Sequence, residues 1–335
     1  MEIEKIDEFE EIINKYENIM LVGHVNPDGD CIGSLMGMYS YLTQINKNVM
    51  PVVPNMYPNF LSFLDTEGAV VVYATNENRV EEFLNNSPLV ICMDLNGLKR
   101  VDELGRLIES RELELVLVDH HLYPEPIFKV AISYPTASST CEIAYYIIRG
   151  LNNFSHLSYE CAAALYTGMM TDTNNFSNSV TPYTFKMAGE LIAMGVDKEL
   201  IQSKVLSSFS ENRMRLMGYM LYNNLKVLEP YHAAFMILSD EVKESFAFER
   251  GDNEGFVNLP LSMQDVELSA FFTQDKEFIK VSLRSKSTFS ANRFAMEYFN
   301  GGGHERASGG KIKMPLERVE EYFINSLKEF IVKEG

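Results

Sequence analysis

The chain of 335 residues lacks three features that would place it in a simple class of protein. It has no apolar run close to the ~20 residues that a membrane helix needs. Its four cysteines, at positions 31, 92, 141 and 161, form no Cys-x-x-Cys pair of the kind that indicates zinc. Basic residues are also scarce, because 29 Lys and Arg stand against 47 Asp and Glu, a formal net charge of -18. This charge argues against a protein that coats long nucleic acid, since such binding depends on many basic contacts to phosphate.

The remaining composition is that of a folded protein. A hydrophobic fraction of 46% and a charged fraction of 23% are ordinary for globular chains, and the length suffices for two domains. The first twenty residues are acidic and amphipathic, without the basic start and apolar centre of a signal peptide. We therefore expect a cytoplasmic protein with reduced, buried thiols and no membrane association.

The first half of the chain alternates short apolar runs with helical patterns. Runs such as "LVICM" and "LELVLV" are apolar on both faces, as strands of a parallel sheet covered by helices require. The expected strands are 20–23, 49–53, 70–73, 89–93 and 115–118. This alternation predicts a doubly wound α/β domain with a mainly parallel sheet.

The second half changes character. Residues 158–226 show apolar residues at helical spacing, and the last segment, "ENRMRLMGYMLYNNL", looks like a connector. Strand patterns then return, with two strands around a turn at 274–276, followed by a helix at 291–299, a glycine-rich loop and a helix from about 315 to 333. We expect a smaller α+β domain here.

Acidic residues and histidines gather at the ends of the predicted strands, although the chain has only six histidines. "GHVNPDGDCIGS", residues 23–34, follows the apolar run at 19–22, and "VDHH" follows "LELVLV". Asp94 comes directly after "LVICM", and Asp172 lies in "TDT" after a helical segment. Because the C-terminal ends of parallel strands meet at one edge, the strand-end residues should share one crevice. They are His24, Asp28, Asp30, Asp94, Asp119, His120 and His121.

Each motif taken singly has an ordinary structural explanation. Asp94 could cap a following helix, and the "DGD" at 28–30 could be a plain turn. Together they favour a metal site, because four carboxylates in one crevice cannot all stay ionised without cations. Oxygen ligands with some imidazole suit Mn²⁺, Mg²⁺ or a similar ion. Two ions about 3.5 to 4 Å apart could share Asp94 and activate water near neutral pH.

Two further motifs allow more than one interpretation. The glycines of "FNGGGHERASGG", residues 299–310, could cap the preceding helix, but three in a row before His304 and Arg306 favour close approach to an anion. In "SSTCEIAYYI", Ser139 and Glu142 fit a helix capping box, so we interpret this segment as structural, with a possible place in the site lining. Cys31 is interpreted as a packing residue.

The order of these motifs resembles the DHH phosphoesterase superfamily, and "GGGH" is similar to the signature of the DHHA1 domain. The resemblance covers nearly the whole chain, and the layout is most like the bacterial nanoRNase and pAp phosphatase branch. It implies a DHH catalytic domain at 1–190, a helical linker at 191–226 and a DHHA1 substrate-binding domain at 227–335.

The resemblance also implies roles for individual residues. One Mn²⁺ would be bound by His24, Asp28 and Asp94. The second would be bound by Asp30, Asp94, His120 and Asp172. Mg²⁺ or Co²⁺ could take their place.

The implied catalytic group is Asp119, His120 and His121. Asp119 would orient a histidine, as metal-bound imidazoles usually require, and His121 would face the substrate phosphate. The implied substrate-binding residues are His121, Arg284, Gly302, Gly303, His304 and Arg306.

The implied reaction is metal-assisted hydrolysis of phosphate esters. Short oligoribonucleotides, from dimers to about five-mers, would give mononucleotides, and adenosine 3′,5′-bisphosphate (pAp) would give AMP and phosphate. A homodimer is implied as well.

Several alternatives stay open. Within the superfamily, they are a phosphodiesterase acting on linear or cyclic dinucleotides such as pApA or pGpG, and a RecJ-like exonuclease on single-stranded DNA. Family II pyrophosphatases share the first four motifs but not "GGGH". From another class, the chain could be a nucleotide-binding sensor without catalysis, which loss of a ligand would favour, and no ligand is lost.

Overall fold

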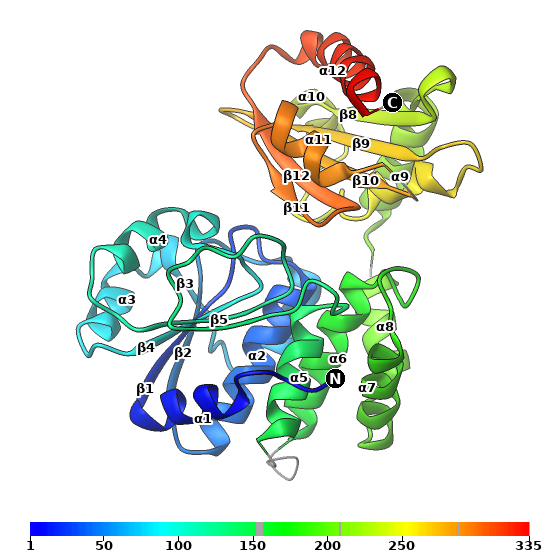
Figure 1. Cartoon of the computed structure of the whole chain (residues 1–335). Coiled ribbons are helices and arrows are strands. Elements are labelled where there is room, and N and C mark those ends of the chain that lie inside the picture. The colour runs from blue at the N-terminus through cyan, green and yellow to red at the C-terminus, as the bar shows by residue number, and fades with distance from the viewer. Residues whose placement is uncertain (152–156, 208, 287–288, 335) are drawn as a thin grey trace. The chain divides into compact units, whose positions relative to one another are not determined.

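The structure is a computed structural model that describes residues 1–151, 157–207, 209–286 and 289–334. The chain divides into two compact units, Met1–Ser208 and Phe209–Gly335, each built on its own sheet (Figure 1). The division lies within the predicted linker at 191–226, and the predicted boundaries at residues 190 and 226 stay a prediction. In the described part of the chain, no helix has both the length and the apolar character needed to cross a membrane.

The first unit contains a six-stranded sheet in the order β3-β2-β1-β4-β5-β6, with every neighbouring pair parallel. Its strands are β1 (Asn18–Val22), β2 (Asn48–Val53), β3 (Val71–Val72), β4 (Leu89–Met93), β5 (Leu115–Asp119) and β6 (Val130–Ser133). Its α-helices are α1 (Ile6–Lys15), α2 (Gly29–Gln44), α3 (Glu77–Leu84), α4 (Asp102–Glu109), α5 (Thr140–Gly150), α6 (Tyr159–Asp172), α7 (Pro182–Ala193) and α8 (Lys198–Leu206). Short 3-10 helices are η1 (Asn59–Leu64), η2 (Tyr73–Thr75) and η3 (Leu98–Val101).

Strand β1 shows why this sheet is doubly wound. Ile19 and Leu21 belong to the core that contains α2, α5 and α6, whereas Met20 and Val22 belong to the core on the other face, with residues of α3 and α4. All four side chains are fully buried. Burial of both faces requires the continuous apolar run seen in the sequence, so the predicted doubly wound α/β fold is confirmed. The edge strand β6 was not predicted, because it is four residues long and buries only alternate side chains.

The strand order reverses direction between β1 and β4. Sequence-consecutive strands run outward from β1 through β2 to β3, and the chain then returns to β4 on the opposite side of β1. The loops after β1 and β4 therefore diverge to opposite faces of the sheet and leave a crevice at their C-terminal ends. This is where the first and second acidic motifs lie.

The second unit contains a mixed sheet in the order β11-β12-β10-β9-β8-β7, antiparallel except for the parallel pair β8 and β9. Its strands are β7 (Lys226–Leu228), β8 (Ala233–Leu238), β9 (Leu268–Gln274), β10 (Ile279–Ser285), β11 (Gly302–Gly303) and β12 (Ala307–Ile312). Its helices are α9 (Glu211–Tyr219), the π-helix η5 (Met220–Asn224), η6 (Glu229–Tyr231), α10 (Asp240–Ser245), η7 (Phe256–Ser262), α11 (Ala291–Tyr298), η8 (Leu316–Arg318) and α12 (Val319–Glu334). The predicted α+β character is confirmed, as is the hairpin of β9 and β10.

The sheet of the second unit is covered on both faces. Phe235 and Phe272 pack against α11 and α12, for example against Phe294 and Phe323. The opposite face packs against Leu216 of α9 and against neighbouring residues of η5 and η7. The segment expected to be a connector therefore contributes to the core of this unit.

Candidate active site

His24 begins the loop between β1 and α2. The N–H of Gly23 still pairs with the carbonyl of Val52 at 3.0 Å, so the sheet holds the loop up to this point. His24 Nδ1 lies 2.9 Å from the carbonyl oxygen of Val25. Because a carbonyl can only accept, Nδ1 carries a proton, and Nε2 is the ring nitrogen left to bind a cation or accept a second proton.

Asp28 is the N-cap of α2. Its Oδ1 accepts hydrogen bonds from the main-chain N–H groups of Asp30 and Cys31, both at 3.1 Å. The same oxygen lies 3.7 Å from His24 Nε2. The "DGD" motif is thus a helix start that directs Asp28 and Asp30 into the crevice.

Asp94 occupies an unusual backbone conformation at the end of β4. Its φ of 61° lies in the left-handed region, which Asp tolerates better than most residues. Its side chain caps no neighbouring helix, since η3 is preceded by Gly97 and α4 by Val101. Instead, its Oδ2 lies 3.3 Å from His24 Nε2 and its Oδ1 lies 3.5 Å from His120 Nε2.

His120 joins the remaining acidic residues. Its Nε2 lies 3.6 Å from Asp30 Oδ2 and 3.7 Å from Asp172 Oδ2. Its Nδ1 faces the carbonyl of Ala137 at 3.4 Å. Asp172 is the last residue of α6, so one imidazole meets carboxylates from three separate elements of the chain.

These separations suit ligands that surround common cations. Distances of 3.3 to 3.7 Å between nitrogen and oxygen are longer than good hydrogen bonds. By contrast, atoms that each lie about 2.0 to 2.2 Å from one ion are roughly 3 to 3.5 Å from one another. The structure therefore brings together all six residues predicted to bind metal, and their geometry fits divalent ions. They are His24, Asp28, Asp30, Asp94, His120 and Asp172.

The electrostatics of the cluster also call for positive charge. Burial opposes protonation of His24, but the neighbouring carboxylates of Asp28 and Asp94 raise its pKa to about 10. Burial and the neighbouring Asp94 raise the pKa of Asp30 well above its ordinary value. His120 likewise has a raised pKa, because the carboxylates of Asp94, Asp172 and Asp30 together outweigh its burial. Bound cations would supply the positive charge that stabilises these buried carboxylates in the ionised form.

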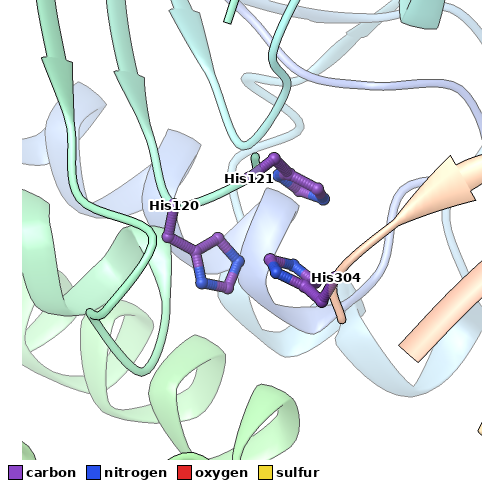
Figure 2. A group of neighbouring side chains, drawn as sticks. All are labelled: His120, His121 and His304. Carbon is purple, nitrogen blue, oxygen red and sulfur yellow. The ribbon is translucent and has the colours of Figure 1, made fainter. Parts of the chain in front are cut away.

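Asp119 and His121 form a closely spaced pair at the end of β5, beside Asp94. Asp119 Oδ1 lies 2.7 Å from His121 Nδ1, and Oδ2 accepts from the His121 main-chain N–H at 3.0 Å. The rings of His120 and His121 stand edge to face, with centroids 5.1 Å apart (Figure 2). Burial lowers the pKa of His121, although Asp119 opposes this effect. The histidine whose orientation Asp119 fixes is therefore His121.

In the second unit, the predicted substrate-binding residues share one edge of the sheet. Gly302 and Gly303 form β11 and pair with β12, and His304 and Arg306 lie in the turn between these strands. Arg284 on β10 is opposite Ala307, next to Arg306 in sequence. The structure thus places these residues on or between neighbouring strands of one sheet.

The glycine motif is not a simple helix cap. The left-handed residue after α11 is Asn300, with φ of 47°, so the cap does not need a glycine. An added Cβ at Gly301 would lie 1.8 Å from the carbonyl oxygen of Gly309, whereas at Gly302 the nearest side-chain atom would be 3.9 Å away. Gly301 is required by close packing of the backbone, and Gly302 is not.

The capping box predicted in "SSTCE" is only half formed. Ser139 Oγ accepts from the N–H of Glu142 at 3.0 Å, as expected. The carboxylate of Glu142 accepts from the N–H of Ser138 at 3.2 Å instead of the N–H of Ser139. The next residue, Thr140, donates a hydrogen bond to Asp94 Oδ1 at 3.0 Å, a contact that no sequence pattern predicts. Sequence spacing gave no signal for it, because the two residues are far apart along the chain.

Cys31 is closer to the candidate metal ligands than its packing interpretation implies. Its Sγ and ligand atoms of His24 and Asp94 all lie within 4.8 Å of one another. The thiol is buried, and burial together with Asp94 raises its pKa well above the ordinary value.

Each of the two units contains a region that matches a known protein family. A model of the DHH family, N-terminal domain, matches residues 18–169, and a model of the DHHA1 domain matches residues 232–333. Two curated relatives are both named bifunctional oligoribonuclease and PAP phosphatase NrnA. The protein of Thermus thermophilus is 28% identical over 99% of this chain and 96% of its own length, and that of Bacillus subtilis is 28% identical over 90% and 91%.

Solved structures show the same fold. An exopolyphosphatase-related protein from Bacteroides fragilis is 39% identical, with a TM-score of 0.91 over 97% of this chain and 96% of its own. RecJ of Thermus thermophilus, solved with Mn²⁺, has a TM-score of 0.60 at 15% identity over 98% of this chain and 55% of its own, which shows a likeness of fold alone.

Proposed function

Because this chain belongs to the DHH family and carries a DHHA1 domain, we propose that it is a metal-dependent phosphoesterase. It hydrolyses short oligoribonucleotides to mononucleotides and removes the 3′-phosphate of pAp. The proposal follows the activity for which its relatives in Thermus thermophilus and Bacillus subtilis are named, and the chain spans 96% and 91% of their lengths.

The arrangement around Asp94 is the observation that supports catalysis most directly. This buried carboxylate lies between His24 and His120, and His120 in turn faces Asp30 and Asp172. Structural ion pairs usually bring opposite charges to hydrogen-bond distance, but here the atoms stay at the separation that ligands of one ion require.

We assign the first ion to His24, Asp28 and Asp94, and the second to Asp30, Asp94, His120 and Asp172. When bound, the ions supply Lewis-acid polarisation of the phosphate and lower the pKa of water. Mn²⁺ is the proposed metal, with Mg²⁺ or Co²⁺ as substitutes, because the ligands are carboxylates and imidazoles without a thiolate.

His121 is proposed to hold the substrate phosphate. Asp119 accepts a hydrogen bond from the Nδ1–H of this histidine, and Nε2 lies on the other side of the ring. When Nε2 is protonated, the imidazolium donates to a phosphate oxygen, and Asp119 stabilises that charge. Arg284, Gly302, Gly303, His304 and Arg306 are proposed to bind the rest of the nucleotide.

A substrate panel with Mn²⁺ tests this function. It contains pAp, a diribonucleotide, a five-mer RNA, long single-stranded DNA, pApA and pyrophosphate. Turnover of pAp and the short RNAs, lost with chelator and in Asp94→Asn, is expected. Predominant turnover of long DNA would contradict the substrate assignment, and nucleotide binding without any turnover would indicate a sensor.

Two similar proteins suggest further substrates for that panel. The chain is 26% identical to the cyclic-di-AMP phosphodiesterase GdpP of Bacillus subtilis, of which it spans only 49%. The exopolyphosphatase-related protein of Bacteroides fragilis adds inorganic polyphosphate as a substrate to examine. Preferred hydrolysis of cyclic-di-AMP or polyphosphate would change the proposed substrate but not the proposed reaction, the hydrolysis of a phosphate bond. The homodimer and the cytoplasmic location remain predictions, for light scattering and cell fractionation to check.

A further inference from the structure

We propose that Thr140 is a positioning residue that fixes the carboxylate of Asp94, which would bind both proposed metal ions; this inference rests on the proposed function. Its Oγ1 donates to Asp94 Oδ1 at 3.0 Å, and both side chains are buried. A threonine hydroxyl has one proton to give, and an ionised carboxylate can only accept, so the direction of this bond is fixed. The bond therefore sets the rotation of the Asp94 carboxylate.

The same helix start also holds the second predicted ligand. The N–H groups of Thr140 and Cys141, at the first turn of α5, donate to Asp30 Oδ2 at 2.6 Å and to Oδ1 at 2.9 Å. Each carboxylate oxygen keeps a lone pair for a cation after accepting one hydrogen bond. One end of one helix thus orients two carboxylates, that of Asp30 in the first turn of α2 and that of Asp94 at the end of β4.

The start of α5 is itself held in place by hydrogen bonds to Glu142. Glu142, which is buried, accepts from the N–H of Ser138 at 3.2 Å and from Thr184 Oγ1 at 2.8 Å. Thr184 belongs to the capping box that begins α7. The first turn of α5 therefore has little freedom to shift, so its hydroxyl reaches Asp94 at a defined place. Buried partners of this kind matter to metal sites because they hold ligands in the required orientation.

Matched substitutions distinguish the effect of losing the Thr140 hydroxyl from an effect on folding. Thr140→Val keeps the shape and the main-chain bond to Asp30 but removes the hydroxyl, and Thr140→Ser keeps the hydroxyl. Thr167→Val is the control, because Thr167 is a fully buried threonine whose hydroxyl donates only to the helix carbonyl of Ala163 at 2.8 Å. Circular dichroism and thermal unfolding establish that each variant is folded.

Mn²⁺ binding, measured by calorimetry and by the electron paramagnetic resonance of bound manganese, is the primary readout. We expect Thr140→Val to bind Mn²⁺ about 10- to 100-fold more weakly, the usual effect of losing a ligand's hydrogen-bond partner. Thr140→Ser should restore binding, and Thr167→Val should leave it unchanged. Hydrolysis of pAp should need correspondingly more Mn²⁺ in Thr140→Val.

The two proposals fail in different ways. Wild-type affinity for Mn²⁺ in a folded Thr140→Val, or equal losses in Thr140→Val and Thr140→Ser, would overturn the role of Thr140. A wild-type protein that binds Mn²⁺ but hydrolyses none of the panel would contradict the proposed function, while the metal-binding comparison would still decide the role of Thr140. A wild-type protein that binds no divalent ion would overturn both.

Discussion

Asp119 accepts two hydrogen bonds from His121, one from ring Nδ1 at 2.7 Å and one from the main-chain N–H at 3.0 Å. Asp119 is fully buried. Both oxygens of this carboxylate are thus used to hold one histidine.

Asp119→Asn should therefore impair turnover more than metal binding. The amide keeps the shape but loses the charge that stabilises protonated His121, so we expect kcat to fall about 10- to 100-fold. Steady-state kinetics with pAp and calorimetry with Mn²⁺ measure the two effects. Asp7→Asn, on the exposed face of α1, is the surface control. A parallel loss of Mn²⁺ affinity would instead make Asp119 a metal ligand.

Removal of divalent ions should abolish activity and lower the stability of the first unit. Without cations, the buried acids remain close together, and burial, Asp94 and Asp172 all raise the pKa of Asp30. Binding at a hundred times Kd would add about 2.7 kcal/mol, a shift of the unfolding midpoint by about 5 to 10 °C for a unit of this size. Calorimetric scans with chelator and with Mn²⁺ measure it. An unchanged midpoint would show that no ion binds the folded state preferentially.

Asp94→Asn and Asp65→Asn should have opposite effects on Mn²⁺ binding and on stability, although both replace a buried aspartate. Asp65 accepts from Tyr57 Oη at 2.9 Å and from the N–H groups of Ala69 and Val70 at 2.6 and 3.2 Å, so its role is structural. Its replacement should cost about 1 to 3 kcal/mol of stability with kcat retained. Asp94→Asn should lose Mn²⁺ binding and remain folded. Urea unfolding and Mn²⁺ titration distinguish the two, and loss of metal binding in Asp65→Asn alone would contradict this division.

Gly168→Ala should disturb the site through packing. An added Cβ would lie 2.2 Å from Cys141 Sγ and 3.0 Å from Asp30 Cα, so we expect a loss of about 1 to 3 kcal/mol from overpacking together with weaker Mn²⁺ binding. Gly189→Ala in α7 is the matched control, because an added Cβ there meets no atom within 4 Å. That change should stabilise the helix by about 0.5 to 1 kcal/mol. Thermal unfolding of both variants tests the pair, and stabilisation by Gly168→Ala would show that the helix contact is loose.

The native protein should react slowly with thiol reagents. All four cysteines are buried, and burial raises the pKa of Cys92 and of Cys161 to about 12. At pH 8 only about one in ten thousand of such thiols is ionised, against about one in four at an ordinary pKa near 8.5. Unfolding in urea should restore ordinary reactivity, which a chromogenic disulfide reagent measures. Rapid reaction of the native protein would show that a thiol is exposed.

The sequence by itself determined the strands and the chemistry at their ends. The apolar runs of β1, β4 and β5 show burial on both faces, and a polar motif follows each of them, so parallel strand ends had to bring His24, Asp94 and His120 to one edge. These features are local, because period and residue type are readable within a short window.

Only the tertiary structure decided how those groups are oriented. The left-handed backbone conformation of Asp94 could not be predicted from the sequence, because the residue is not a glycine. Thr140 reaches Asp94 across 46 positions and Asp30 across 110, from a helix start that local patterns identify only as a cap. Such contacts arise when separate elements pack against one another, and no periodicity within either element encodes which side chains will meet.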